Sequence, residues 1–183
     1  MIELIQLAEE HRWQTLDWRN DPDVAQYMYR TDPISREVHD AWFSRLLVAQ
    51  DHKGWAVVMD DKPVGAAFIS EIDNDNRRAS WAFYLADPST RGRGVGSAVE
   101  YLVLEQAFTE LKLHKLCGEV LSFNQAVLAM HKKFGFVEEG CLREHWMRDG
   151  KWLDVHVIAM FDKTWAEKRI GFSEKLRSRG LVP

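Results

Sequence analysis

The chain has 183 residues and a formal net charge of −4, and its hydrophobic content of 46% and charged content of 28% are ordinary for a globular protein. The length predicts a single domain over residues 1–183. The acidic balance argues against a nucleic-acid partner, which selects a basic face, and no run of ~20 apolar residues is present to span a membrane.

A few residue types indicate the compartment and the metal content. The first four residues lack the basic and apolar regions of a signal peptide. Cys117 and Cys141 lack metal or redox spacing, and the seven histidines lack the spacing of metal ligands. We therefore expect a cytoplasmic protein that binds no metal.

In chain order, the first expected elements are a strand at residues 2–7 and a helix at 11–20, which ends before Asp21 and Pro22. A second helix should begin after Ser35, which is a good N-cap residue. Strands follow at 55–59, 64–72 and 79–86, and the last two form an antiparallel pair joined by the polar residues 73–78. The apolar face of the second helix is expected to consist of Val38, Trp42, Leu46 and Ala49.

The second half of the chain alternates helices and strands. A helix should begin at residue 95 and extend to about 111, and a short strand should follow at 115–121. Asn124 and Gly135 are suited to cap a helix at 125–134. Strands at 142–148 and 151–161 are joined by Asp149-Gly150, a strong hairpin signal, and the tail 163–183 is expected to be partly helical.

The glycine-rich segment 91–96 lies between an apolar strand and a helix start, which predicts an anion cradle. Glycines adopt positive φ and let the backbone approach a ligand closely. The first helical amides have no internal partner, and the helix dipole adds positive charge there. Arg91 and Arg93 add further charge. A diphosphate would fit such a site, although a helix-capping glycine turn would also explain the segment.

The segment 91–96 does not match two common phosphate-binding loops, but it resembles a third. No Gly-Lys-Ser/Thr follows the segment, so it is not a Walker loop, and glycines at 92, 94 and 96 are out of register for a dinucleotide fingerprint. The spacing Arg-x-x-Gly-x-Gly resembles the acyl-CoA pyrophosphate loop of the GNAT N-acetyltransferase family. Residues 124–136 resemble that family's Asn-x-x-Ala-x-x-hydrophobic-Tyr-x-Lys-x-Gly-Phe motif, with Ala126 one place early and His131 in place of tyrosine.

The resemblance covers roughly residues 2–161 and implies a fold. That fold is α/β (α+β), with a mixed, mostly antiparallel twisted sheet of about seven strands, helices on both faces, and a V-shaped splay between strands 4 and 5. The pantetheine arm of acetyl-CoA would enter the splay and pair with backbone groups, as in β-augmentation. A homodimer is compatible with the resemblance. The implied cofactor-binding residues are Leu85, Ala86, Arg91, Gly92, Arg93, Gly94, Val95, Gly96, Ser97, Asn124 and His131.

Acetyl transfer to an amine needs a donor for the thioester oxygen, a base for the amine and an acid for the leaving thiolate. The backbone amide of Leu85 or Ala86 could serve the oxygen. His131 matches the family's tyrosine and could protonate the thiolate, or it could be a helix-surface residue on the cofactor side or a simple hydrogen-bond partner. Glu119, in mid-strand, and Glu71, at a strand end, are candidate bases, with solvent exposure as the alternative for each and a water chain as a substitute.

Residues 18–29 resemble an Arg-Asn…Met-Tyr stretch of the N-acetyltransferases in pseudaminic-acid biosynthesis. Those enzymes acetylate the 4-amino group of UDP-linked 4-amino-4,6-dideoxy sugars on the route to flagellin glycosylation. Arg19 could bind phosphate and the tyrosines could stack on uracil, although residues 27–29 could equally be core and surface residues of a short helix. The implied substrate-binding residues are Arg19, Asn20, Tyr27, Met28, Tyr29 and Trp81.

Two alternatives remain open. N-terminal acetyltransferases of ribosomal proteins have a related Trp-x-Asn-Asp-Pro beginning, so a peptide amine is a second acceptor class. A non-catalytic CoA-binding module on the same fold is the other alternative, because the glycine loop implies binding without proving turnover. Aminoglycosides and polyamines are disfavoured, because such cations would select clustered carboxylates.

Overall fold

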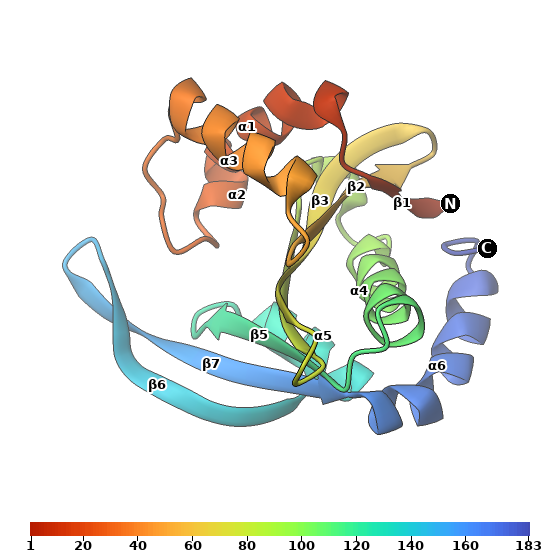
Figure 1. Cartoon of the computed structure of the whole chain (residues 1–183). Coiled ribbons are helices and arrows are strands. Elements are labelled where there is room, and N and C mark those ends of the chain that lie inside the picture. Colours follow the sequence, from red (N-terminus) through yellow and green to blue (C-terminus); the bar gives the residue numbers. More distant parts are fainter.

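The computed structural model describes residues 1–183 and contains one mixed sheet of seven strands in the order β1-β2-β3-β4-β5-β7-β6 (Figure 1). Only the β4–β5 pair is parallel. The predicted mixed, mostly antiparallel sheet is therefore confirmed. The strands are β1 Ile2–Gln6, β2 Lys53–Met59, β3 Lys62–Asp73, β4 Arg78–Leu85, β5 Lys115–Leu121, β6 Val137–Arg148 and β7 Lys151–Phe161.

Local capping signals explain where most helices begin and end. The Ser35 hydroxyl accepts from the amide of Val38, and Gly135 ends a helix with a φ of +113°, as predicted. Asn124 occupies the N-cap position, but its side chain makes no capping hydrogen bond, which corrects that expectation. The helices are α1 Arg12–Asn20, α2 Pro22–Ala25, α3 Arg36–Val48, α4 Val95–Glu105, α5 Gln125–Phe134 and α6 Asp162–Arg177, with one π-helical turn at Gln106–Glu110.

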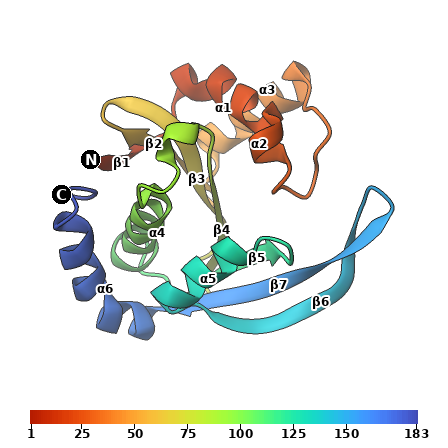
Figure 2. The ribbon, with the colours of Figure 1, turned by 180° about the vertical axis from the view of Figure 1, so that it is seen from behind.

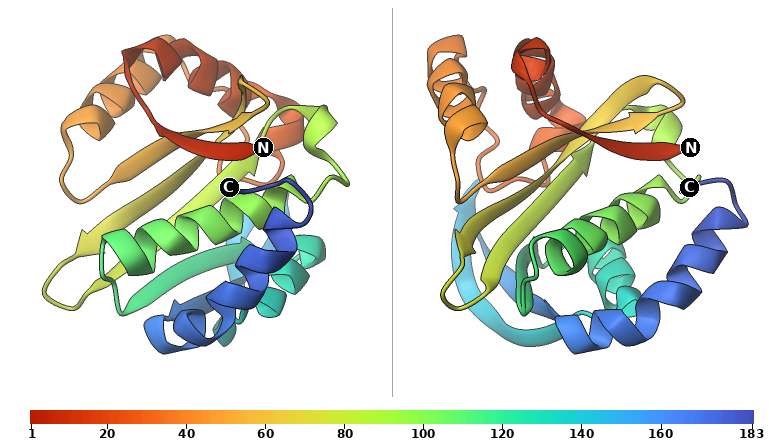
Figure 3. Two further views of the ribbon diagram at one scale, coloured as in Figure 1. Left: turned by 90° about the vertical axis from the view of Figure 1, so that its right-hand side faces the viewer. Right: turned by 45° about the vertical axis from the view of Figure 1, so that its right-hand side comes forward.

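The helices cover both faces of the sheet, as predicted. In Figure 3, α1–α3 lie on one side of the sheet, and α4 and α6 lie on the other. The main hydrophobic core, a cluster of 26 buried residues, lies on the α4 side. None of the helices is both long and apolar enough to cross a lipid bilayer.

The inner face of α3 differs from the prediction. His39, Phe43 and Leu46 are buried, whereas Val38 is 64% exposed. The apolar periodicity pointed to Val38 because a histidine was not expected inside. His39 occupies the inner position because its Nε2 lies 2.7 Å from the carbonyl oxygen of Arg12, in α1.

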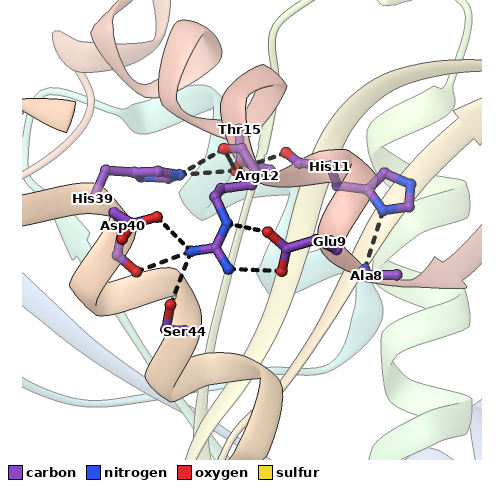
Figure 4. A network of polar contacts seen from close by, with 8 residues as sticks. All are labelled: Ala8, Glu9, His11, Arg12, Thr15, His39, Asp40 and Ser44. Carbon is purple, nitrogen blue, oxygen red and sulfur yellow. Dashed lines mark hydrogen bonds and ion pairs between the residues drawn. The ribbon is translucent and has the colours of Figure 1, made fainter. Parts of the chain in front are cut away.

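Arg12 fastens α1 to α3 (Figure 4). Its buried guanidinium donates to both carboxylate oxygens of Glu9, at 2.6 and 2.7 Å, and to Asp40 Oδ1 at 2.9 Å. It also donates to the Ser44 hydroxyl at 3.0 Å. Charge-assisted bonds of this kind are the strong ones, and losing one partner leaves a buried charge. The network therefore holds the start of α1 against α3.

The sheet opens between β4 and β5. The two strands pair only at Arg78–Lys115, Ala79–Leu116 and Ser80–Cys117. From residue 81 of β4 and residue 118 of β5 onward, they have no pairing with each other. The predicted V-shaped splay is therefore confirmed, and the backbone groups along its edges have no strand partner.

A long hairpin, β6–β7, curves around the open side of the sheet. Asp149 and Gly150 form its turn with φ values of +49° and +74°, as the sequence predicts. A register shift between Leu142 and Trp146 interrupts the pairing, and such a bulge bends a strand. Figure 2 shows the hairpin tip rising toward the segment between α2 and α3.

Candidate active site

The glycine loop forms the N-terminal end of α4. Gly92 and Gly94 have φ values of +71° and +81°, which glycine adopts without strain. The Ala98 amide donates to the Gly94 carbonyl at 3.1 Å, so the amides of residues 95–97 have no intrahelical partner. Free amides and the positive end of the helix dipole give the loop the geometry of an anion cradle.

The two arginines of the loop reach other elements. Arg91 Nη2 lies 2.7 Å from Asp23 Oδ2, in α2, and Arg93 Nη2 lies 3.7 Å from Asp60 Oδ2. Both pairs are solvent-exposed, and exposed pairs are weak. A phosphate can therefore compete with the carboxylates for either guanidinium.

A third guanidinium, which the sequence motifs do not include, lies against the loop. A Cβ placed on Gly94 would lie 3.2 Å from both terminal nitrogens of Arg179 and 3.2 Å from Leu181 Cδ1. The tail is held there because the Ile2 amide donates to the Leu181 carbonyl at 2.8 Å. Arg179 therefore adds positive charge at the cradle.

Of the two backbone amides expected to donate to the thioester oxygen, Leu85 and Ala86, only one is free. The Ala86 amide donates to the Val64 carbonyl at 2.8 Å, so it is not free, which corrects the expectation for that amide. Backbone groups in an antiparallel strand point alternately to opposite sides. The amide of Leu85, which pairs in register with Gly65, therefore points into the splay.

His131 lies buried on α5 beneath the splay. It is 5% exposed, and its Nδ1 lies 2.9 Å from Oε1 of Glu100, on α4. Its ring packs against Trp81, with ring centres 5.3 Å apart, and against Phe136 at 5.2 Å. This burial contradicts the alternative that His131 is a helix-surface residue.

Trp81 is not brought together with the other expected acceptor residues. It is 6% exposed and belongs to the main core on the α4 side, where it also stacks on Phe83. The residues of β4 alternate between the two faces, so Trp81 points away from the α1–α3 side. Its expected contact with the acceptor is therefore corrected to a packing role next to His131.

Tyr29 and Glu119 meet on the α1–α3 side of the splay. The Tyr29 hydroxyl donates to Glu119 Oε2, and burial together with this bond raises the pKa of Tyr29. The ring of Trp146, from β6, lies 4.7 Å from that of Tyr29. Two separately predicted residues, a candidate base and an acceptor residue, are thus in direct contact.

Glu71 lies at the closed end of the splay. Its Oε2 accepts from the Ser80 hydroxyl at 2.7 Å, and its φ of +54° marks an irregularity in β3. Glu71, Arg78, Ala79, Ser80 and Cys117 line a pocket of about 240 Å³. Cys117 is half-buried, and burial raises the pKa of its thiol. Glu71 is therefore farther from the open end of the splay than Glu119, along the same face.

Arg19 is a largely buried cation that has no carboxylate partner. Its Nη1 is buried without any hydrogen bond, and burial lowers the pKa of the guanidinium. The hydroxyl of Tyr84, on the neighbouring face of β4, is also buried and unpartnered. Unpaired buried charge is costly. The guanidinium of Arg19 therefore keeps a positive charge that no carboxylate of the protein neutralises.

Two other residues that were expected to bind the acceptor have structural roles. The Asn20 side chain bonds both backbone groups of Ile34, donating to the carbonyl at 3.0 Å and accepting from the amide at 2.8 Å. Its amide is thereby committed, which corrects the expectation that it binds acceptor. Met28 packs partly buried against the cluster of Val24, Ala66 and Tyr84.

Arg148, on β6, connects the hairpin to the segment after α2. It donates to the carbonyl of Gln26 at 2.6 Å and to that of Met28. Its guanidinium lies 5.4 Å from the ring centre of Phe123, which is 6.0 Å from that of Tyr27. Tyr27 and Phe123 are 48% and 44% exposed, so two aromatic rings are open to solvent beside an arginine.

Three residues of the site were missed by sequence analysis: Glu100, Arg148 and Arg179. In the sequence, Glu100 is one residue of an ordinary helix, and Arg148 and Arg179 resemble exposed surface charges. The one signal in the sequence is the position of Glu100 on the apolar side of the 95–111 helix, because a glutamate is rarely buried without a partner. No group of three or more His, Cys, Asp or Glu side chains is arranged to hold a metal ion.

A protein-family model for an acetyltransferase (GNAT) domain matches residues 2–137. The probable N-acetyltransferase YjcK of Bacillus subtilis is 29% identical over 111 residues, which are 61% of this chain and 61% of YjcK. The acetyltransferase PseH of Campylobacter jejuni is 27% identical over 119 residues, covering 65% of this chain and 72% of PseH. The chain thus matches about three fifths of the length of YjcK.

A solved structure shares the whole arrangement. The spermidine N-acetyltransferase from Vibrio cholerae, in complex with CoA and spermine, has a TM-score of 0.84 at 21% identity. The match covers 90% of this chain and 98% of that protein. At this level of identity, the likeness establishes the common fold.

Proposed function

The chain belongs to the acetyltransferase (GNAT) family, and from this premise we propose that it transfers an acetyl group from acetyl-CoA to a primary amine of a small molecule. The family resemblance seen in the glycine loop and in residues 124–136 is thereby confirmed. We further propose that the acceptor is a sugar nucleotide, with the 4-amino group of a UDP-linked 4-amino-4,6-dideoxy sugar as the nucleophile.

The residues at the splay supply the groups that acetyl transfer needs. The amine nitrogen forms a bond to the acetyl carbon, and the carbon–sulfur bond breaks. Glu119 takes the proton that the amine loses, directly or through a water, and Glu71 is the second candidate for that role. The Leu85 amide donates to the thioester oxygen, a contact worth about 2.7–4 kcal/mol in other acyl transfers. His131 returns a proton to the departing thiolate.

The observation that carries the acceptor proposal is unpaired positive charge on the acceptor side. Arg19 and Arg148 have no carboxylate partner, and each has a buried nitrogen with no hydrogen bond. Tyr27 and Phe123 expose aromatic rings beside Arg148. Guanidinium groups suit phosphates, and aromatic rings suit a base. This combination fits a nucleoside diphosphate better than it fits a polycation.

A polyamine is the second candidate acceptor. It is favoured by the structural likeness to a spermidine N-acetyltransferase. On the α1–α3 side, however, Glu119 is bonded to Tyr29 and Glu71 to Ser80, and arginines lie nearby. A polyamine would have to displace these bonds and tolerate like charges, which disfavours it.

A sugar-nucleotide acceptor would place the protein in the biosynthesis of pseudaminic acid, on the route to flagellin glycosylation. This part of the proposal rests on residues 18–29 and on the unpaired arginines. A peptide N-terminus, the other alternative from the sequence, gains no specific support from the contacts of Arg19 or Arg148.

The test is a thiol-release assay with acetyl-CoA and three acceptors at equal concentration: a UDP-linked 4-amino-4,6-dideoxy sugar, spermidine, and a peptide with a ribosomal-protein N-terminus. We expect kcat/KM for the sugar nucleotide to exceed the others by at least ~100-fold, as loss of phosphate contacts implies. Preference for spermidine or the peptide would replace the proposed acceptor. CoA binding with no thiol release from any acceptor would instead indicate a binding module.

A further inference from the structure

Glu100 is the only buried carboxylate of the chain. Its side chain is 0% exposed, although it lies on the helix that begins at the glycine loop. Oε1 is 2.9 Å from Nδ1 of His131, and Oε2 has no hydrogen-bond partner. Burying a carboxylate costs free energy unless the group is paired and hydrogen-bonded. The acetyl transfer described above does not use Glu100 directly.

The surroundings of the pair are apolar. Trp81 and Phe136 pack against the imidazole, from β4 and from the residue before β6, and Met130 lies beside Gly96 where α5 meets α4. Burial raises the pKa of Glu100, and the hydrogen bond to His131 opposes this. The proton balance of the pair is therefore set by burial and by the contact between the two side chains.

The number of protons on the Glu100–His131 pair sets its net charge, and the buried surroundings favour one net charge over the other. One proton lies between the carboxylate and Nδ1 in every state that keeps the hydrogen bond. If Nε2 carries a second proton, the pair is neutral overall; if Nε2 is bare, the pair has a net charge of minus one. Buried surroundings disfavour net charge. The neutral pair, with a hydrogen on Nε2, is therefore the stable form.

We propose that Glu100 is a positioning residue that keeps a proton on Nε2 of His131 and holds the imidazole so that this proton faces the leaving thiolate. Nε2 makes no hydrogen bond within the protein, so it is free for a ligand. The inference rests on the proposed acetyl transfer, in which His131 is the acid. It also explains how histidine can replace the tyrosine of the family motif. The neutral Glu–His pair presents a neutral donor, as a tyrosine hydroxyl does.

The first test detects the proton on Nε2 of His131 directly and needs no acceptor. In protein labelled with nitrogen-15 at histidine, the Nε2 resonance of His131 is identified by its absence in His131→Asn. We expect Nε2 to be protonated at pH 7, and we expect Glu100→Gln to lower its proton affinity by about tenfold or more, because the neutral amide no longer balances the imidazolium. A bare Nε2 at pH 7, or the same titration in Glu100→Gln, would overturn the proposal.

The second test separates a positioning role from a structural one. We expect Glu100→Gln to lower kcat about 10- to 100-fold, as loss of a carboxylate behind a functional histidine does elsewhere, while KM for acetyl-CoA stays unchanged. His131→Asn retains a group for Glu100 to bond but removes Nε2, and it should lower kcat about 100-fold or more. Adding Glu100→Gln to His131→Asn should change kcat less than about twofold.

The outcomes distinguish this inference from the proposed function. If no amine is acetylated but the Nε2 proton depends on Glu100, the proposed function fails and the pair stands. If acetylation occurs and both Glu100→Gln and His131→Asn retain full kcat, the pair has no part in the reaction. Thermal melting of each variant shows whether it is folded before the titration and the kinetics are interpreted.

Discussion

The two ends of the splay are built in different ways. At the cofactor end, one contiguous segment supplies backbone amides, and its shape depends on the positive φ of Gly92 and Gly94. At the acceptor end, side chains converge from α1, from the segment after α2, from β5 and from β6. The first end is encoded by local sequence, and the second exists only after the chain has folded.

This difference predicts different sensitivities to mutation. The cofactor end should tolerate changes of exposed side chains and fail when a glycine is replaced. The acceptor end should respond to single side chains, and each should affect the acceptor's KM more than the affinity for acetyl-CoA. Three variants examine this contrast and a fourth examines the support beneath the acceptor end, from the largest expected effect to the smallest.

Gly94→Glu should weaken acetyl-CoA binding about 100-fold or more. The new side chain would be strained at a φ of +81°, would meet Arg179 and Leu181, and would bring negative charge to the cradle. Titration calorimetry measures the affinity. Gly140→Glu is the matched control, because a Cβ there meets nothing within 4 Å. Unchanged affinity in Gly94→Glu would move the diphosphate away from this loop.

Arg19→Met should raise the acceptor's KM about 10- to 100-fold, because a hydrogen bond to a charged group is worth about 1.5–3 kcal/mol. The affinity for acetyl-CoA should not change. Arg45→Met, at an exposed position of α3, removes the same charge without touching the splay. An acceptor KM that stays the same in both variants would take Arg19 out of the acceptor site.

Tyr29→Phe should raise the acceptor's KM roughly 3- to 10-fold. The variant removes the hydroxyl that bonds Glu119 but keeps the ring next to Trp146, so only one hydrogen bond is lost. Tyr101→Phe, whose ring packs against Trp165 on the other side of the sheet, is the control. Equal steady-state kinetics for the two variants would show that the Tyr29–Glu119 bond does not shape the acceptor site.

The smallest effect concerns pH and the support beneath the acceptor end. Burial lowers the pKa of His39 below its ordinary value of 6.5. The unfolded chain therefore binds more protons below pH 6.5, and stability falls as pH decreases through that range toward the folded-state pKa. Thermal melts at pH 7 and pH 5 should show a smaller decrease in Tm for His39→Gln than for the exposed control His145→Gln. An equal decrease in both would contradict this.

Local signals account for what the sequence predicted well. The order of strands and helices, the turn at Asp149-Gly150 and the helix end at Gly135 each depend on a few adjacent residues, and all three are confirmed. The splay follows from the family resemblance and is also confirmed. The glycine loop has the expected conformation, while its role in binding acetyl-CoA stays a prediction.

The errors arise where side chains meet across the fold. Val38 was placed inside because a buried histidine was not expected, and Trp81 was assigned to the acceptor although its strand turns it to the other face. The Ala86 amide was counted as free because its bond to Val64 depends on the register of β3 and β4. Glu100 acquires a meaning only when α4 and α5 bring it to His131.

The opening between β4 and β5 also affects how the purified protein should behave. Two internal strand edges carry amides and carbonyls with no partner, and exposed edges invite association with other chains. A ligand that fills the gap completes the ladder and stabilises only the folded state, so it raises the melting temperature, and at a given concentration the rise increases with the logarithm of its affinity. Thermal-shift screening of candidate metabolites would then identify molecules that occupy the groove, without any knowledge of the reaction.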